Sequence, residues 1–349
     1  MSAVRVLVGM SGGVDSSVAA ALLLEQGHEV VGATLKLWGG ASDSGCCSVA
    51  DVEDARRVAQ QLGVTHHVFS FTDDFDEHVV APYVADHAAG RTPNPCIECN
   101  RHLKFDRFLR RATSLGFDAV ATGHHARVAA TPAGFELRRG ADGAKDQSYV
   151  LHVLGQAQLA RTLLPVGDLH KEEVRRRATA LGLRTAGKPD SQDVCFITAS
   201  AGRAAFLAAR TGLHAAEVVD AGGAPVGRVD AVELVTVGQR RGLGVAGGTG
   251  RPRYAVAVDV PGRRVVVGEP ADLLRDGVEV GPASWVGAAP ADGAAVLAQV
   301  SAHGAGRPAR WAPGRVVWDE PQRAVAPGQA VVLYAAADPD RCLGGAAAS

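Results

Sequence analysis

The sequence predicts an α/β protein with a doubly wound parallel sheet, followed by two small, mostly β units of which the last is a barrel. As far as Arg210, apolar strand-like runs alternate with helical periodicity, the pattern of a parallel sheet with crossover helices. From Ala216 onward, short valine-rich runs recur between Gly, Pro and Asp, which is typical of antiparallel β structure. The 349 residues suggest two or three domains, and we expect boundaries that give 1–201, 202–272 and 273–349.

The first predicted unit of structure is a strand, a glycine turn and a helix. The apolar run Val4–Gly9 leads into MSGGVDSS at Met10–Ser17, and an apolar-periodic segment, Val18–Leu24, follows. A helix N-terminus offers unpaired N–H groups and partial positive charge, and glycines let the backbone approach a ligand closely. The loop is therefore a candidate anion cradle, although it has neither the lysine of G-x-x-x-x-G-K-[ST] nor the spacing G-x-G-x-x-G.

The rest of the N-terminal part continues the alternation. In a doubly wound sheet ligands bind at the carboxyl ends of strands, so Leu35–Trp38 could flank a nucleotide base. Strands are expected at His28–Leu37, His66–Phe71, Asp118–Thr122 and Phe135–Arg139, and helices at Ala50–Leu62, Asp74–Ala89, Leu103–Leu115, Lys171–Leu181 and Gly202–Arg210.

Cysteines carry the second chemical signal. In TPNPCIECN, Thr92–Asn100, the prolines favour an extended approach that places Cys96 and Cys99 just before the helix at Leu103. The helix dipole and nearby cations would stabilise a thiolate there, which makes Cys99 a candidate nucleophile. Cys195 ends the polar stretch of GKPDSQDVCFI and is predicted at a loop-to-strand junction. A C-x-x-C pair alone could equally bind zinc or act as a redox pair.

Composition limits the compartment and the partners. Six cysteines in a chain of this length are not a disulfide framework, and MSAVRVLVGM lacks the features of a signal peptide. Because no apolar run is long enough to span a bilayer, we expect a cytoplasmic protein without membrane contact. The formal charge of −1 gives no whole-chain signal for nucleic acid. An RNA footprint must then be local, and candidate basic clusters are Arg101–Arg111, Arg175–Arg177, Arg240 and Arg241 with Arg251 and Arg253, and Arg307–Arg315.

The C-terminal part is expected to hold two β units that separate near Asp272–Pro282. The tail Gly344–Ser349 is expected to be disordered. The predicted strands are Val232–Val237, Tyr254–Val260, Val265–Val267, Val296–Val300, Arg315–Trp318 and Ala330–Tyr334.

Two sets of motifs resemble known families. Ser11–Ser16 matches S-G-G-x-D-S, the signature of the PP-loop ATP pyrophosphatases, whose fold is similar to the adenine nucleotide alpha hydrolases. Those enzymes bind ATP, release pyrophosphate and leave an adenylated substrate. The further motifs TPNPCIECN, ATGHHA, KDQSYVL, PDSQDVCFI, VGQRRGLG and AVAPGQAVVLY resemble, in order and spacing over essentially the whole chain, the tRNA-specific 2-thiouridylases.

That resemblance implies roles for individual residues. Cys99 corresponds to the family's nucleophile and Cys195 to the cysteine that carries the persulfide. The Asp15 carboxylate would repel phosphates directly, so its natural role is to hold Mg²⁺ between them. ATP would be bound by Gly9, Met10, Ser11, Gly12, Gly13, Val14, Asp15, Ser16, Leu35 and Gly123. The target base or the tRNA would be contacted by Asn94, Pro95, Cys96, His124, Lys145, Asp146, Gln147 and Gln329.

The resemblance also implies partners and leaves a mechanistic alternative. The partners would be the anticodon region of a tRNA and a sulfur donor such as a cysteine desulfurase or a relay protein, and we expect a monomer. Many family members carry Asp where this chain has Cys96, so Cys96, Cys99 and Cys195 could instead hold a [4Fe–4S] cluster. One alternative function is a different PP-loop adenylating ligase, but such an enzyme would not use the cysteines. The other is an RNA-binding or sulfur-carrier protein that has lost catalysis. The intact glycine loop argues against that loss.

Overall fold

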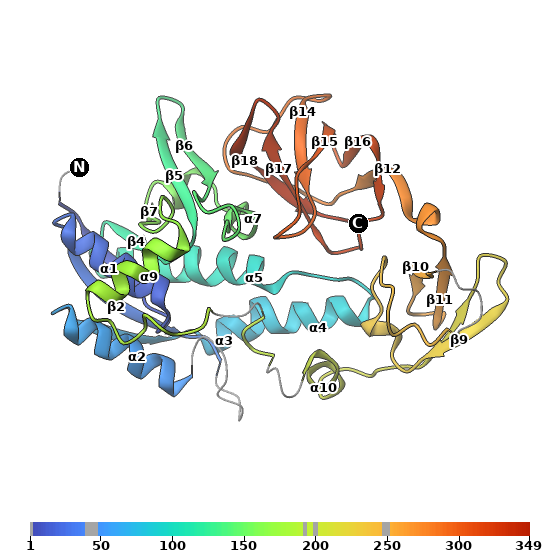
Figure 1. The fold of residues 1–349 in the computed structure, drawn as a ribbon, viewed down its shortest axis with the longest axis horizontal. Coiled ribbons are helices and arrows are strands. Elements are labelled where there is room, and N and C mark those ends of the chain that lie inside the picture. Colours follow the sequence, from blue (N-terminus) through green and yellow to red (C-terminus); the bar gives the residue numbers. More distant parts are fainter. Residues whose placement is uncertain (1–2, 39–47, 191–193, 198–201, 246–251) are drawn as a thin grey trace.

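The N-terminal part of the computed structural model is built on a five-stranded sheet (Figure 1). The structure describes residues 3–38, 48–190, 194–197, 202–245 and 252–349. The strand order is β3-β2-β1-β4-β7, and every neighbouring pair is parallel. The strands are β1 (Arg5–Gly9), β2 (Glu29–Lys36), β3 (His66–Ser70), β4 (Ala119–Ala121) and β7 (Thr162–Leu163). The predicted parallel α/β sheet is confirmed.

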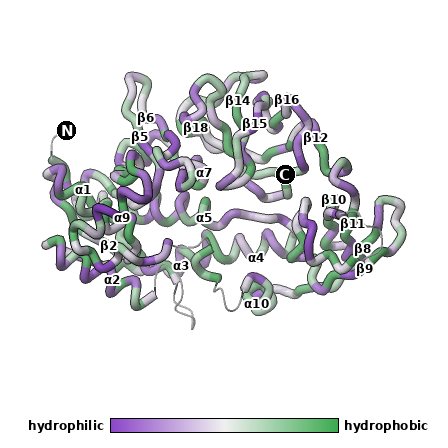
Figure 2. The backbone as a smooth tube through the Cα atoms, viewed as in Figure 1, coloured by the Kyte–Doolittle hydropathy of each residue, from purple (hydrophilic) through white to green (hydrophobic). Residues whose placement is uncertain are grey.

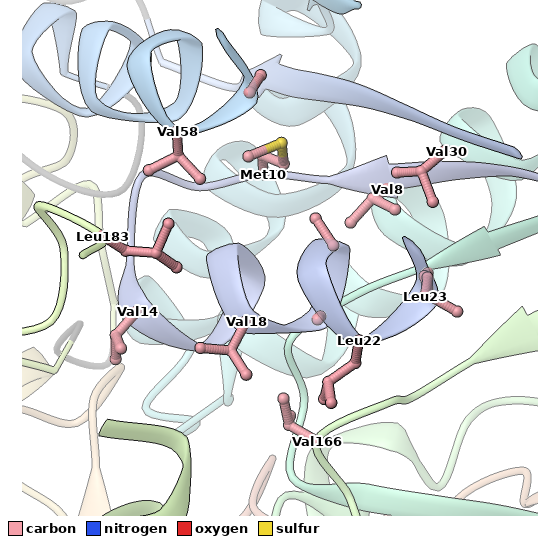
Figure 3. Close-up of a cluster of buried hydrophobic side chains, with 14 of the residues drawn as sticks. Val8, Met10, Val14, Val18, Leu22, Leu23, Val30, Val58, Val166 and Leu183 are labelled. Atoms are coloured by element: carbon pink, nitrogen blue, oxygen red, sulfur yellow. The ribbon is translucent and has the colours of Figure 1, made fainter. Parts of the chain in front are cut away.

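Helices cover both faces of this sheet. On one face α1 (Val14–Glu25), α2 (Val49–Gln61) and α9 (Lys171–Ala180) pack on inward side chains of β1 and β2 (Figure 3). On the other face, residues of α6 (Phe108–Ser114) pack against Leu7 and Val120. Helix α1 is apolar nearly all round because it lies between the sheet and α9. Helix α2 shows alternating hydrophilic and hydrophobic stretches (Figure 2) because only one side of it faces the core.

Two long helices cross the molecule and carry π-helical turns. The first consists of α3 (Thr72–Phe75), the π-helical segment Asp76–Val80 and α4 (Ala81–Ala88). The second consists of α5 (Pro95–Glu98), the π-helical segment Cys99–Arg107 and α6. The predicted start at Leu103 is therefore wrong, since this helix begins at Pro95. The side chain of Asn94 caps it by accepting a hydrogen bond from the Cys96 N–H, and proline suits the first helical position, where no N–H is needed.

A four-stranded sheet follows α10 (Gly202–Ala208), in the order β10-β11-β8-β9. Its strands are β8 (Ala216–Val219), β9 (Pro225–Val229), β10 (Tyr254–Asp259) and β11 (Arg264–Gly268). The strand predicted from Val232 is wrong, because Val232–Leu234 forms a 3₁₀ turn. The buried Glu233 carboxylate turns inward there to accept hydrogen bonds from the backbone and ring of His214.

The C-terminal strands form a barrel that also takes in a hairpin from the N-terminal part. The strand order is β12-β16-β15-β14-β17-β18-β6-β5, with β13 pairing with β18. A bridge between Val280 and Ala348 joins the far ends of the C-terminal strands, which closes the predicted barrel. The strands are β5 (Ala126–Thr131), β6 (Gly134–Arg139), β12 (Leu274–Glu279), β13 (Ser284–Trp285), β14 (Ala295–Gln299), β15 (Arg307–Ala312), β16 (Arg315–Arg323), β17 (Ala330–Ala335) and β18 (Asp338–Ala347).

The chain end is ordered, contrary to prediction. Strand β18 pairs with β17, and the N–H groups of Ala348 and Ser349 bond the carbonyls of Gln329 and Glu279. A Cβ on Gly345 would lie 2.6 Å from the Val331 carbonyl oxygen. Glycine at this position therefore permits close packing of the strands, although the sequence predicts a flexible tail. The two boundaries between the three expected domains stay a prediction. No helix in the described part of the chain is both long and apolar enough to cross a membrane.

Candidate active site

A cavity of about 420 Å³ lies where β1, β2 and β4 end. Its size falls in the range of small-ligand sites. Most of the residues predicted for ATP, sulfur and RNA line it: Gly9, Met10, Ser11, Gly13, Val14, Asp15, Ser16, Leu35, Pro95, Cys96, Cys99, Gly123, His124, Lys145, Asp146, Gln147 and Cys195. Three predicted site residues do not line the cavity: Gly12, Asn94 and Gln329. Each forms a hydrogen bond in a segment next to the lining.

The glycine loop presents the N-terminus of α1 to this cavity. Gly13 is the N-cap residue, and no side chain caps the helix, which leaves its first N–H groups for a ligand. The Ser16 hydroxyl accepts a hydrogen bond from the Ser11 N–H and donates to the Gly13 carbonyl, both at 3.2 Å. These bonds hold the loop in the shape of an anion cradle before any ligand binds.

The loop is anchored from outside by Lys188. Its Nζ donates to the Gly12 carbonyl at 2.9 Å and to carboxylates of Asp51 and Asp54 on α2. Burial lowers the pKa of Lys188, but the bonds from Asp51 and Asp54 outweigh burial and raise it, so the anchor is charged. Gly12 has φ +72° and its α-carbon faces the Asp51 backbone, which leaves no room for a side chain.

Asp15 is held in a chain of alternating charges. Both of its carboxylate oxygens lie 2.7 Å from Lys171 Nζ, and His125 Nε2 lies 3.1 Å from Oδ1. Burial raises the pKa of Asp15, but the hydrogen bonds from His125 and Lys171 outweigh it and hold the pKa below its usual value. Lys171 also pairs with Asp190 at 2.9 Å, and Asp190 pairs with Lys145 at 2.8 Å. Burial likewise raises the pKa of Asp190, and these lysines hold it well below its usual range.

The residues around Asp15 fit a magnesium ion by their chemistry. Mg²⁺ in phosphate sites takes one or two carboxylates together with phosphate oxygens. Asp15 supplies one such carboxylate; Asp190 bonds the same Lys171 ammonium, which therefore occupies the position between the two carboxylates.

The turn after β4 packs directly on the glycine loop. A Cβ on Gly123 would lie 2.5 Å from Ser16 N and 2.6 Å from the Asp15 carbonyl carbon, so only glycine fits there. The next residue, His124, is buried, and its Nδ1 is bonded to Thr122 Oγ1 at 2.7 Å. Burial lowers the pKa of His124 well below its usual value, so it lines the cavity as a neutral imidazole.

The three predicted site cysteines border the cavity. Cys99 is buried within an apolar cluster, and Cys195 packs against the same cluster beside Phe196. The strand predicted after Cys195 is wrong, because residues 194–197 form a turn in which Val194 has φ 57°. Cys96, Cys99 and Cys195 are thiols and are not joined by disulfides here. Among the described residues, which include all three, no group of three or more His, Cys, Asp or Glu side chains is arranged to hold a metal ion, so the geometry does not favour the iron–sulfur alternative.

The KDQ segment forms one wall, and each of its side chains has a different partner. Lys145 pairs with Asp190, whereas the Gln147 amide oxygen accepts a hydrogen bond from the His125 N–H at 2.9 Å. Asp146 is buried, and Arg139 and Ser148 donate to its carboxylate. Asp146 therefore shapes this wall through internal bonds.

The barrel also contributes residues to the wall of the cavity. Ala302 and His303, in the loop between β14 and β15, line the same space as the glycine loop. Gln329 supports this loop, since its amide donates to the Val300 carbonyl. The C-terminal unit is thus part of the site.

Comparisons with known proteins agree with this geometry. Residues 4–199 match the tRNA methyl transferase HUP domain, and residues 275–348 match an aminomethyltransferase beta-barrel domain. The tRNA-specific 2-thiouridylase MnmA of Roseiflexus sp. (strain RS-1) is 44% identical over 98% of both chains. The proteins of the same name from Solibacter usitatus and Acidothermus cellulolyticus are 45% and 47% identical, over 97% and 95% of this chain and 98% and 94% of theirs.

This chain belongs to the MnmA family of tRNA-specific 2-thiouridylases. Among solved structures, the U34-tRNA thiolase NcsA from Methanococcus maripaludis with its [4Fe-4S] cluster aligns with a TM-score of 0.36 and 16% identity, over 59% of this chain and 64% of that one. A similarity at that level does not bear on the function or the cofactor of this chain.

Several residues at or next to the cavity of this MnmA family member are not predicted from the sequence. Lys171 and Lys188 are lysines of a kind common in helices and loops, so their residue type gives no signal. His303 follows a predicted strand and belongs to none of the motifs. The only available signal was the position of Lys188 in the motif that also carries Cys195.

Two of the four predicted basic clusters, Arg101–Arg111 and Arg175–Arg177, are largely ion-paired in this MnmA family member. Arg101 pairs with Glu98, Arg107 with Asp74, and Arg110 with Asp106. Arg175 pairs with Asp190, and both Arg176 and Arg177 pair with Glu173. Arg251 lies outside the described residues. Because these arginines are ion-paired within the protein, their clustering in the sequence is not by itself evidence of phosphate binding.

Proposed function

We propose that this protein is a tRNA-uridine 2-sulfurtransferase that uses ATP to replace the C2 oxygen of the wobble uridine with sulfur, releasing AMP and pyrophosphate. The observation that carries this proposal is one cavity bordered by the glycine loop at the start of α1 and by Cys99 and Cys195. A cavity that serves only adenylation has no use for two thiols in its wall.

The first step activates the base. The C2 oxygen is a poor leaving group, and its attack on the α-phosphorus of ATP converts it into AMP ester and frees pyrophosphate. The loop N–H groups and the ammonium of Lys171 stabilise the charge that develops on the phosphates. Mg²⁺, when bound by the Asp15 carboxylate, would neutralise further charge on those phosphates. The base must leave the anticodon stack to enter this cavity.

The second step transfers sulfur. Cys195 accepts a sulfane sulfur from a donor, and the terminal sulfur of its persulfide attacks C2 while AMP leaves. The Cys99 thiolate then attacks the Cys195 sulfur, which breaks the S–S bond, leaves sulfur on C2 and forms a Cys99–Cys195 disulfide. In the variant route Cys99 first releases hydrosulfide, which attacks C2. Either route ends in a disulfide that an external thiol must reduce.

The remaining site residues are assigned roles according to the part of the cavity wall on or next to which they lie. Asn94, Pro95 and Cys96 border the target base at the start of α5, and Cys96 takes the place of the aspartate that many family members carry. His124, Lys145, Asp146, Gln147 and Gln329 shape the tRNA side. The partners are the anticodon region of tRNA and a cysteine desulfurase or sulfur relay protein. We infer a cytoplasmic monomer with domains at 1–201, 202–272 and 273–349.

The test is nucleoside analysis of unmodified tRNA after incubation with ATP and a persulfide donor. We expect 2-thiouridine with the natural chain and none with Cys99→Ser or Cys195→Ser, while both variants still bind ATP. Cys342→Ala is the matched control, because Cys342 is a buried thiol in the barrel that does not line the cavity. Full activity of both site variants would refute the proposed chemistry, and absence of pyrophosphate release by the natural chain would favour a binding protein.

A further inference from the structure

Arg139 lies at the end of β6, the strand through which the N-terminal hairpin joins the barrel. Its guanidinium donates to Asp146 Oδ2 and to Gln299 Oε1, each at 2.7 Å, and its Nε donates to the Pro339 carbonyl at 3.1 Å. The guanidinium carbon also lies 3.6 Å from the centroid of the Tyr334 ring. One side chain thus links segments that are far apart in the sequence.

The first link holds the KDQ wall. Asp146 Oδ1 accepts hydrogen bonds from the N–H groups of Gly140 and Ser148, both at 3.0 Å. The Ser148 hydroxyl donates to Asp146 Oδ2 and also lies 2.9 Å from the Tyr334 hydroxyl. Lys145 and Gln147, which flank Asp146, line the cavity. The charge of Arg139 therefore compensates the one buried carboxylate that shapes this wall.

The second link holds the barrel wall. The Gln299 amide nitrogen donates to the carbonyls of Ser301 at 2.8 Å and Ala302 at 3.2 Å. Its oxygen is the acceptor for Arg139, so the orientation of the amide depends on that guanidinium. Ala302 and His303, at the end of this chain of bonds, line the same cavity as the KDQ segment.

The chemistry of the link requires arginine. A guanidinium is planar and offers several donors in fixed directions, so it can bond two acceptors and still stack on an aromatic ring. A lysine ammonium has the same charge but no plane to stack. Gln299 is 1% exposed and Asp146 is 8% exposed, so neither has water as a ready substitute partner.

We infer that Arg139 is a positioning residue that holds the KDQ wall and the barrel wall of the cavity in register for tRNA, without taking part in ATP binding. The inference rests on the proposed function, since the walls matter only if RNA enters between them. Arg139 does not itself bond the glycine loop, Asp15 or Lys171, and the KDQ wall reaches Asp15 only through intervening residues, Asp190 with Lys171 and His125. Loss of Arg139 should therefore separate the tRNA side of the reaction from the ATP side.

The experiment compares Arg139→Lys with Arg138→Lys in the full chain. Arg138 is a matched control because it is similarly exposed, at 24% against 22% for Arg139, and also ties β6 to the C-terminal sheet through Asp338. For each variant, ATP affinity is measured by calorimetry, tRNA affinity by fluorescence anisotropy and thiolation by kcat/KM for tRNA. For Arg139→Lys we expect ATP affinity within about twofold of the natural chain and kcat/KM for tRNA lower by roughly tenfold to a hundredfold, since misplaced binding groups cost that much.

Each outcome decides the inference. Equal losses of ATP and tRNA binding in Arg139→Lys, unchanged tRNA parameters, or the same loss in Arg138→Lys would overturn it. If Arg139→Lys does not fold, Gln299→Met tests the barrel link alone, and unchanged tRNA affinity and kcat/KM in that folded variant would also overturn it. Failure of the natural chain to thiolate tRNA would instead refute the proposed function, while tRNA affinity would still test the positioning role.

Discussion

Replacing Gly123 with alanine tests whether the turn after β4 fixes the position of the ATP loop. The new methyl carbon would lie 2.5 Å from Ser16 N, whereas ordinary contacts begin at 3.4 Å. The obstructing atoms belong to the backbone of α1 and cannot rotate away. The helix N-terminus must therefore retreat by about 0.9 Å from Gly123, and displacements of that size at a reacting centre cost about a hundredfold in rate.

The same substitution should lower the free energy of unfolding by about 1–3 kcal/mol, the usual cost of overpacking a filled interior. A hundredfold loss of rate corresponds to about 2.7 kcal/mol of lost transition-state stabilisation. The two measurements are pyrophosphate release with saturating tRNA, and unfolding in urea. ATP affinity should fall as well, because the displaced N–H groups are the proposed donors to the phosphates.

The control for Gly123→Ala is Gly281→Ala. A Cβ at Gly281 would meet its nearest neighbour, the Ala347 carbonyl, at 3.8 Å, which is an ordinary contact. This second variant should keep full activity and stability. If Gly123→Ala released pyrophosphate and bound ATP like the natural chain, the packing of the turn against α1 would not fix the loop, and the reasoning would be wrong.

Three further predictions concern charge, acid stability and the thiols. Lys171→Met should slow pyrophosphate release by roughly a hundredfold to a thousandfold, as does loss of a donor to developing charge, with little change expected in Arg176→Met, whose side chain lies on the same helix but is 77% exposed. Because the folded pKa values of Asp15 and Asp190 are depressed, the stability that they contribute is fully present above their unfolded value of 3.8 and is lost as the pH falls through the folded values. The difference in unfolding free energy between the natural chain and Lys171→Met should therefore be full at neutral pH and shrink in acid below that value, and a difference independent of pH would contradict the ion-pair argument. Cys96→Asp should retain thiolation, and anaerobically purified protein should thiolate tRNA without iron; loss of activity in this variant together with a brown, iron-containing sample would restore the cluster mechanism.

The local chemistry of the site was predictable from short stretches of sequence. The apolar run, SGGVDS and the periodic segment after it specify a strand, an anion-binding turn and a buried helix because each depends only on neighbouring residues. The helix start at Pro95 was also readable, since Asn94-Pro95 is a good N-cap followed by a good first position, but the two prolines were interpreted as extended chain. The tail Gly344–Ser349 was misjudged because small residues resemble a flexible end unless a strand partner is known.

The sequence by itself predicted an ATP-binding loop and a pair of sulfur-handling cysteines, because the loop and the cysteine motifs are contiguous and carry their chemistry locally. Only the tertiary structure decided which groups act on them. Lys171 meets Asp15 from a separation of 156 residues, and Arg139 bonds Gln299 across a separation of 160 residues. The physical reason is that periodicity and propensity report on neighbours along the chain, whereas ion pairs between distant elements depend on how the sheet and the barrel pack. The β5–β6 hairpin shows this most clearly, since its local sequence forms two strands but their place in the barrel is set by pairing with β18.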